Sequence, residues 1–143
     1  MSKDTNDQIL LPSPSGKPKG KERGIAVLGA STMDFYSYLD HFPKEGETLL
    51  ANDFKKIPGG KASNQAYMIS NLVQESPVCF ISSVGDDENG KILKENMKKF
   101  YNNDKNIHVI SNMNTTISQI FIDKNQKKRK VTTTGIFFFF FLF

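Results

Sequence analysis

Short apolar runs alternate with amphipathic stretches through the middle of the chain. Two stretches, at about 62–74 and 89–100, repeat apolar residues at helical spacing. Four apolar runs, each bounded by small or polar residues, are typical of buried strands: Ile25–Leu28, Val78–Ile81, Ile107–Ile110 and Ile117–Ile122. Strands that alternate with helices in this order predict an α/β fold built on a doubly wound, mostly parallel sheet.

A long polar segment, residues 40–57, separates the first predicted strand from the first predicted helix. Within it, Thr48–Ala51 shows the alternation expected of a strand that is half exposed to solvent. We therefore expect a small accessory β-sheet in this segment, separate from the main sheet.

The two ends differ from the middle. Residues 1–23 combine prolines and lysines with a single apolar cluster, Ile9–Leu11, which is typical of an unstructured leader and not of a signal peptide. Residues 136–143 are Ile, five Phe, Leu and Phe, a run too short to span a bilayer. The codons of Gly-Ile-Phe-Phe can contain GT followed by a T-rich tract, as at the start of an intron. The hypothesis that follows is that the polyphenylalanine tail is translated intron.

Composition narrows the class of protein. The chain has 143 residues, 38% hydrophobic and 24% charged, which suits one domain with its own core. A single cysteine, Cys79, excludes an internal disulfide framework and favours a reduced, cytoplasmic compartment. The net charge of +4 comes from the basic run 124–130, since the other 14 cations face 15 acids. We therefore expect no nucleic-acid partner. No run reaches the roughly 18 apolar residues that a spanning helix needs, so we expect no membrane partner.

The strongest candidate for chemistry is the segment Pro58–Ala66, in which Gly59 and Gly60 lead into a predicted helix. Glycine lets the backbone approach a ligand closely. A helix N-terminus offers free N–H groups and the positive end of the helix dipole. Lys61 adds a charge, and Asn64 both donates and accepts hydrogen bonds. These residues suit an oxygen-rich ligand such as a polyol, but an ordinary tight turn would use the same glycines.

Acidic residues follow two of the predicted strands. Asp34 comes shortly after the first strand, where open α/β sheets bind ligands, and it could hold two sugar hydroxyls or cap a loop. The run Gly85–Gly90 differs from a calcium loop, because Asn96 stands where the bidentate Glu belongs. We expect this run to be a turn that starts a helix.

His41 and His108 are isolated, so we expect no metal site in this chain.

Together these motifs resemble the amino-terminal half of the ribokinase-like (PfkB-type) carbohydrate kinases. The resemblance covers residues 24–135 and rests on the order and spacing of Val27–Gly29, Asp34, Phe42–Thr48, Pro58–Ala66, Val84–Gly90 and Val131–Gly135. It implies the amino-terminal part of a doubly wound sheet with a small β lid, whose strands would lie near 45–57 and 115–130. It also implies an ATP-dependent kinase acting on ribose or a related sugar, with Mg²⁺ and, as a further candidate, K⁺.

The resemblance implies a site and partners as well. The implied substrate-binding residues are Thr32, Met33, Asp34, Gly60, Lys61 and Asn64. Thr32 stands where family members usually carry Asn, and Ala62 where they usually carry Gly, which leaves room for another sugar or a nucleoside. The partners implied are a small-molecule sugar and a second copy of the chain, paired through the lid.

One family motif is missing. The 143 residues contain no Gly-x-Gly-Asp, the motif whose Asp deprotonates the attacking hydroxyl in family members. We therefore expect no catalytic residue in this chain and no activity from the chain alone. Two alternatives stay open, a non-catalytic sugar-binding module and a truncated product without function.

Overall fold

The computed structural model describes residues 24–73, 76–101, 105–125 and 128–135. The expected leader and the polyphenylalanine tail lie outside the described residues. Within the described part of the chain, neither helix has the length and apolar character that crossing a membrane requires.

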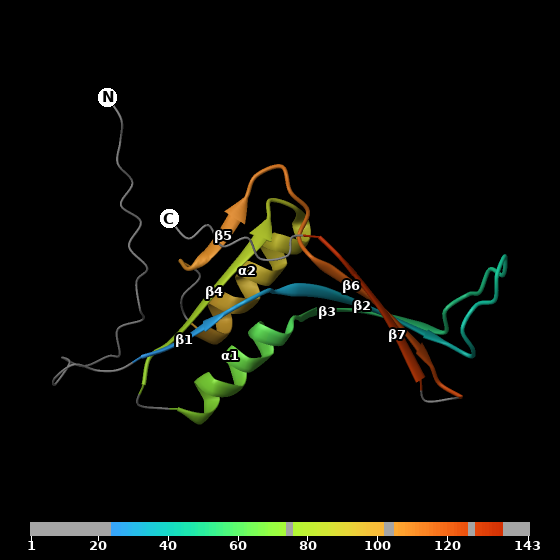
Figure 1. The fold of residues 1–143 in the computed structure, drawn as a ribbon, viewed down its shortest axis with the longest axis horizontal. Helices are drawn as coiled ribbons and strands as arrows, with labels where there is room; N and C mark the ends of the chain where they lie inside the picture. Colours follow the sequence, from blue (N-terminus) through green and yellow to red (C-terminus); the bar gives the residue numbers. More distant parts are fainter. Residues whose placement is uncertain (1–23, 74–75, 102–104, 126–127, 136–143) are drawn as a thin grey trace.

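A three-stranded parallel sheet carries both helices (Figure 1). Helices α1 and α2 contact the central strand and each other, so both cover the same face of this sheet. The elements are β1 (Ile25–Leu28), α1 (Lys61–Leu72), β4 (Val78–Gly85), α2 (Glu88–Tyr101) and β5 (Ile107–Ile110), with the strands in the order β1-β4-β5. The sequence pattern predicts all five, although β4 continues beyond the expected end at Ile81.

A second, four-stranded sheet extends away from the helices (Figure 1). Its strands are β2 (Thr32–Leu39), β3 (Asp53–Gly59), β6 (Ile117–Asp123) and β7 (Lys128–Thr134), in the order β3-β2-β6-β7. Only the β2–β6 pair is parallel. The chain enters this sheet from β1 through residues 29–31 and leaves β3 for α1 through Gly60, so both connections lie where the two sheets meet.

Of the two roles considered for Asp34, capping a loop is wrong, because the residue belongs to strand β2, which the sequence pattern does not predict. Met33 and Phe35 pack toward the main core, while Tyr36 and Tyr38 alternate with them on the opposite face. Apolar or aromatic residues therefore occupy both faces of β2, which removes the simple alternation of apolar and polar positions that marks a strand in a sequence.

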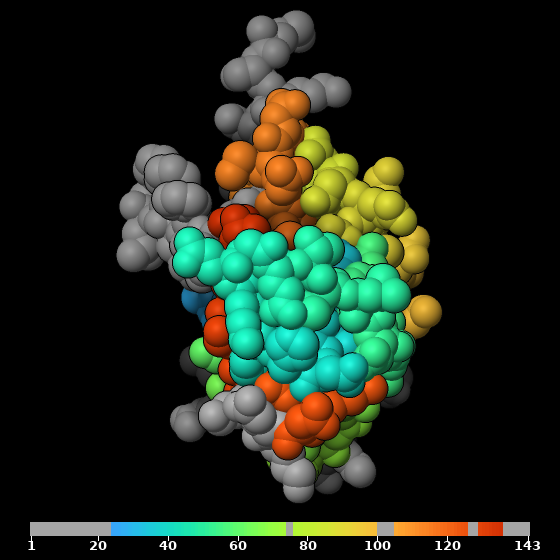
Figure 2. Space-filling view, turned by 90° about the vertical axis from the view of Figure 1, so that its right-hand side faces the viewer, coloured from blue at the N-terminus to red at the C-terminus, as the bar shows by residue number. Residues whose placement is uncertain are grey.

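The accessory strand expected at Thr48–Ala51 is also wrong, and the strand placed near 45–57 begins only at Asp53. Residues 40–52 form the loop that joins β2 to β3, at the far end of the second sheet. Figure 2 looks onto this end, where the teal surface in the centre belongs to the loop. Leu50 is 94% exposed there, so a strand at this position would gain no stabilisation from burying this side chain.

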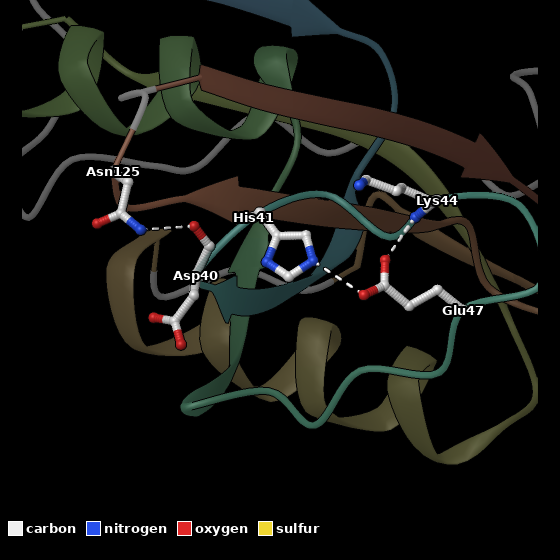
Figure 3. Close-up of polar contacts among 5 residues, drawn as sticks. All are labelled: Asp40, His41, Lys44, Glu47 and Asn125. Atoms are coloured by element: carbon white, nitrogen blue, oxygen red, sulfur yellow. Dashed lines mark hydrogen bonds and ion pairs between the residues drawn. The ribbon is translucent and has the colours of Figure 1, made fainter.

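Hydrogen bonds within the loop take the place of strand pairing (Figure 3). One carboxylate oxygen of Glu47 accepts a hydrogen bond from the Lys44 N–H at 2.8 Å, and the other lies 3.1 Å from His41 Nε2. The Lys44 N–H and the His41 ring together lower the pKa of the Glu47 carboxyl. The loop is anchored to the next hairpin by Asn125, whose side-chain amide donates to the Asp40 carbonyl at 2.8 Å.

The hydrophobic core lies between the helices and the three-stranded sheet. The side chain of Met33 is fully buried in it, so the second sheet is attached to the core at its base. The remaining core residues are Val27, Ala66, Val78, Phe80, Val84, Leu93, Met97 and Ile107. Cys79 points to the other face of β4 and is 1% exposed, and burial raises the pKa of its thiol.

Candidate functional site

The predicted site begins where β2 and β3 pair beside the junction of the two sheets. Thr32 pairs with Gly59 and Asp34 pairs with Ile57. Since alternate residues of a strand point to the same face, Thr32 and Asp34 share one face of the second sheet. The Thr32 hydroxyl donates to Asp34 Oδ1 at 2.7 Å, which fixes the orientation of the carboxylate.

The backbone of Gly59 makes room for this carboxylate. A methyl group on Gly59 would overlap Asp34 Oδ2 and would lie 2.6 Å from Asp34 Cγ. No described residue donates a hydrogen bond to Oδ2, so this oxygen can accept one from a ligand. The bare backbone of Gly59 therefore explains the first glycine of the motif.

The second glycine lets helix α1 start directly against the segment that leads into β2. Gly60 has φ +106°, in the region that favours glycine. A Cβ there would lie 2.6 Å from the Ala30 carbonyl oxygen and 3.0 Å from the Thr32 nitrogen. No side chain caps α1, and its first turn contains no acid. Its positive dipole end therefore lies beside Thr32, and no acidic residue of the first turn neutralises it.

Lys61 and Asn64 lie in the first turn of α1, and both side chains are exposed. Residues three apart in a helix are neighbours on its surface, so the two side chains emerge on one side. The structure thus brings together a carboxylate, a close glycine backbone and a helix N-terminus, and an ammonium group and an amide lie in the first turn of that helix. Each can hydrogen-bond to hydroxyl oxygens or hydrogens.

Met33 is the predicted site residue whose side chain does not belong to this group. It is fully buried in the main core, on the opposite face of β2 from Asp34. Its backbone N–H donates to the Thr116 carbonyl at 2.9 Å. Met33 therefore contributes by fixing the start of β2 and not through a side-chain contact with a ligand.

The acidic run Gly85–Gly90 starts helix α2, as the sequence predicts. Asp87 Oδ1 accepts a hydrogen bond from the Gly90 N–H at 2.8 Å, the contact that caps the helix. The same carboxylate accepts hydrogen bonds from the backbone N–H and the hydroxyl of Thr115. Burial alone would raise the pKa of Asp87, but the hydrogen bonds from Thr115 and Gly90 outweigh it and lower the pKa. The contact with Thr115 has no signal in the sequence, because it joins residues 28 positions apart.

No group of three His, Cys, Asp or Glu side chains in the described ranges is arranged to hold a metal ion. What Thr32, Asp34, Lys61 and Asn64 offer to a ligand is hydrogen bonding and charge.

The fold and the site define a class of protein. It is an α/β protein in which a polar edge lies between a three-stranded parallel sheet and a four-stranded second sheet. The family described as pfkB family carbohydrate kinase matches residues 22–135, and the chain belongs to this family.

Ribokinases are among the proteins to which the chain is similar. It is 38% identical over 104 residues to a ribokinase of Dictyostelium discoideum, covering 73% of this chain and 32% of that protein. It is 34% identical over 101 residues to a deoxyribokinase of Salmonella typhi, covering 71% and 32%. A crystal structure of a ribokinase from Thermotoga maritima matches with a TM-score of 0.64 and 30% identity, over 78% of this chain and 36% of that one. The chain thus spans about a third of the length of the relatives it matches.

Proposed function

We propose that this chain carries the sugar-binding part of an ATP-dependent kinase, which transfers the γ-phosphate to a hydroxyl of ribose or a related sugar. The observation that carries the proposal is the Asp34 carboxylate, oriented by Thr32 and lying over the backbone of Gly59. A carboxylate has two oxygens and can accept hydrogen bonds from two neighbouring hydroxyls of one sugar.

The other site residues fit the same ligand. Lys61 and Asn64 are exposed beside the uncapped N-terminus of α1, so they can reach hydroxyl oxygens that Asp34 does not bind. The role of these residues is to bind the sugar and hold its reacting hydroxyl in one orientation. Orientation of this kind contributes much of the rate in phosphoryl transfer.

The phosphate donor in the proposed reaction is ATP with Mg²⁺, and K⁺ is a further candidate. The 143 residues lack the Gly-x-Gly-Asp motif, so we propose that the chain alone binds the sugar without phosphorylating it. This property is shared with the second candidate function, a non-catalytic sugar-binding module. Free Cys79 supports a reduced, cytoplasmic location for either function.

A second copy of the chain is the proposed protein partner. Ile57 and Val131 lie on the same face of the second sheet as Asp34, and they are 44% and 49% exposed. Apolar side chains on an open sheet face favour burial against another surface. We propose that this face pairs two copies, which would enclose the sugar between them.

Isothermal titration calorimetry with ribose, deoxyribose, fructose and pseudouridine tests the proposal. We expect binding of at least one of these ligands and an affinity at least tenfold lower for Asp34→Asn. The matched control is Asp40→Asn, an exposed acid just beyond the far end of β2, which should leave binding unchanged. A folded chain that binds none of the four would overturn the proposal. Steady ADP production by the chain with ATP and sugar would contradict the expected lack of turnover.

A further inference from the structure

The start of β2 is held by a segment that lies far from it in the sequence. The Met33 N–H donates to the Thr116 carbonyl, and Met33 is the residue that precedes Asp34. Thr115 and Thr116 are 1% and 3% exposed, so this contact is shielded from water. The position of Asp34 therefore depends on where the Thr115–Thr116 segment lies.

Asp87 fixes that segment. Its Oδ2 accepts a hydrogen bond from the Thr115 N–H at 3.0 Å, and its Oδ1 accepts one from the Thr115 hydroxyl at 2.5 Å. The hydroxyl oxygen in turn accepts a hydrogen bond from the Gly85 N–H at 2.9 Å. Thr115 is thus bonded to the end of β4 and to the start of α2 at once.

Close packing against glycines also holds the segment. A Cβ on Gly85 would lie 2.6 Å from the Thr115 nitrogen, and one on Gly90 would lie 2.9 Å from the Thr115 hydroxyl. On the other side, a Cβ on Gly135 would lie 2.5 Å from Thr116 Cα. The segment therefore fits between these elements because glycines, which have no side chain, face it on both sides.

We propose that Asp87 is a positioning residue for the sugar site, acting through Thr115 and Thr116 on the start of β2. It holds the segment to which Met33 is bonded, and so it sets the place of the neighbouring Asp34 carboxylate against Gly59. Hydrogen bonds to an ionised carboxylate are stronger than neutral ones, which makes Asp87 suited to this task. The sugar-binding consequence rests on the proposed function, whereas the effect on β2 does not.

The carboxylate is needed because three donors converge on it. An amide at this position keeps one acceptor oxygen and replaces the other with an NH₂ donor. In Asp87→Asn, either the Thr115 N–H or the Gly90 N–H must therefore face another donor. Thr115→Val removes the hydroxyl and keeps the shape, while Thr115→Ser keeps the hydroxyl.

The test measures amide hydrogen exchange at Met33 by NMR in the full chain. We expect exchange at least tenfold faster in Asp87→Asn and Thr115→Val, and near the wild-type rate in Thr115→Ser. The Gly29 N–H, which donates to the Ile81 carbonyl between β1 and β4, is the reference amide and should change little. Ile107→Val, a mild loss of core packing away from the segment, should not accelerate Met33 selectively.

Ribose titrations of the same variants give the second readout, with affinity expected to fall at least tenfold in Asp87→Asn and to be kept in Thr115→Ser. Unchanged Met33 exchange in Asp87→Asn, or equal acceleration at Met33 and Gly29, would overturn the proposal. Faster Met33 exchange with unchanged ribose affinity would overturn it too. If the wild-type chain binds no sugar, the proposed function fails, and the Met33 exchange still decides whether Asp87 holds β2.

Discussion

Replacing Gly59 with Ala tests the geometry around Asp34 most sharply. The new methyl would lie 2.6 Å from Asp34 Cγ, whereas relaxed carbon–carbon contacts are about 3.5–4.0 Å long. The carboxylate must therefore move by about 1 Å. That movement breaks the 2.7 Å hydrogen bond that the Thr32 hydroxyl donates to Asp34.

The size of the effect follows from that hydrogen bond. Hydrogen bonds to charged groups contribute about 1.5–3 kcal/mol, and each 1.4 kcal/mol corresponds to about a tenfold change in affinity. If the displaced carboxylate must be restored before sugar binds, ribose affinity should fall by about tenfold to a hundredfold in Gly59→Ala. The same overpacking should lower the free energy of unfolding by about 1–3 kcal/mol.

Calorimetric titration with ribose, together with urea unfolding, measures both quantities. Gly46→Ala is the control, because no atom lies within 4 Å of a Cβ at Gly46 and its φ of +75° still imposes a backbone cost. It should destabilise the loop without changing ribose affinity. Wild-type affinity in Gly59→Ala, or an equal loss in Gly46→Ala, would refute the reasoning.

Three further predictions concern other groups. Lys61→Ala and Asn64→Ala should each weaken ribose binding by about threefold to tenfold. The midpoint of urea unfolding should stay unchanged, because both side chains are exposed. A shifted midpoint would show a structural role. The pKa of Asp87 is lower in the folded than in the unfolded chain. The ionised carboxylate therefore adds its full stabilisation above the unfolded pKa of about 3.9, and this stabilisation is lost as the pH falls through the lower pKa of the folded state. Between pH 7 and 2.5, the melting temperature should fall less steeply with decreasing pH in Asp87→Asn than in the wild type. Parallel plots of melting temperature against pH would contradict this. Cys79 should react slowly with iodoacetamide in the folded chain and rapidly in urea, because it is buried with a raised pKa; fast labelling of the folded chain would disprove its burial.

The three-stranded sheet and its helices can be predicted because their sequence patterns are simple. Ile25–Leu28 and Ile107–Ile110 are short apolar runs, and their observed bounds agree with the prediction. Helices α1 and α2 each bury one stripe of residues against the sheet, which gives the helical period. In these elements local pattern and tertiary burial agree.

The second sheet is harder to predict because its strands bury residues unevenly. In β2, aromatic residues lie on both faces, so no alternation remains. In β3, most side chains are exposed, and the strand is defined by pairing with β2 and not by burial. Pairing between distant segments leaves little trace in a local pattern.

The site can be predicted in part. The sequence singles out Gly59 and Gly60, and in the structure both lie close to protein atoms, the Asp34 carboxylate and the backbone of Ala30 and Thr32. Their approach to a ligand stays a prediction. The burial of the Met33 side chain has no signal in the sequence, because the pattern of β2 does not show which of its faces meets the core. The contacts of Asp87 with Thr115 have none either, since only the folded arrangement brings β5–β6 loop residues against the start of α2.

An NMR titration of the labelled chain with ribose tests the central claim most directly. If the sugar binds at the junction of the two sheets, the amide signals of Asp34, Gly60 and Asn64 should shift with ribose concentration, while that of Glu47 at the far end of the second sheet should stay in place. A folded chain whose junction signals do not move, or whose shifts cluster elsewhere, would contradict a sugar site at this position.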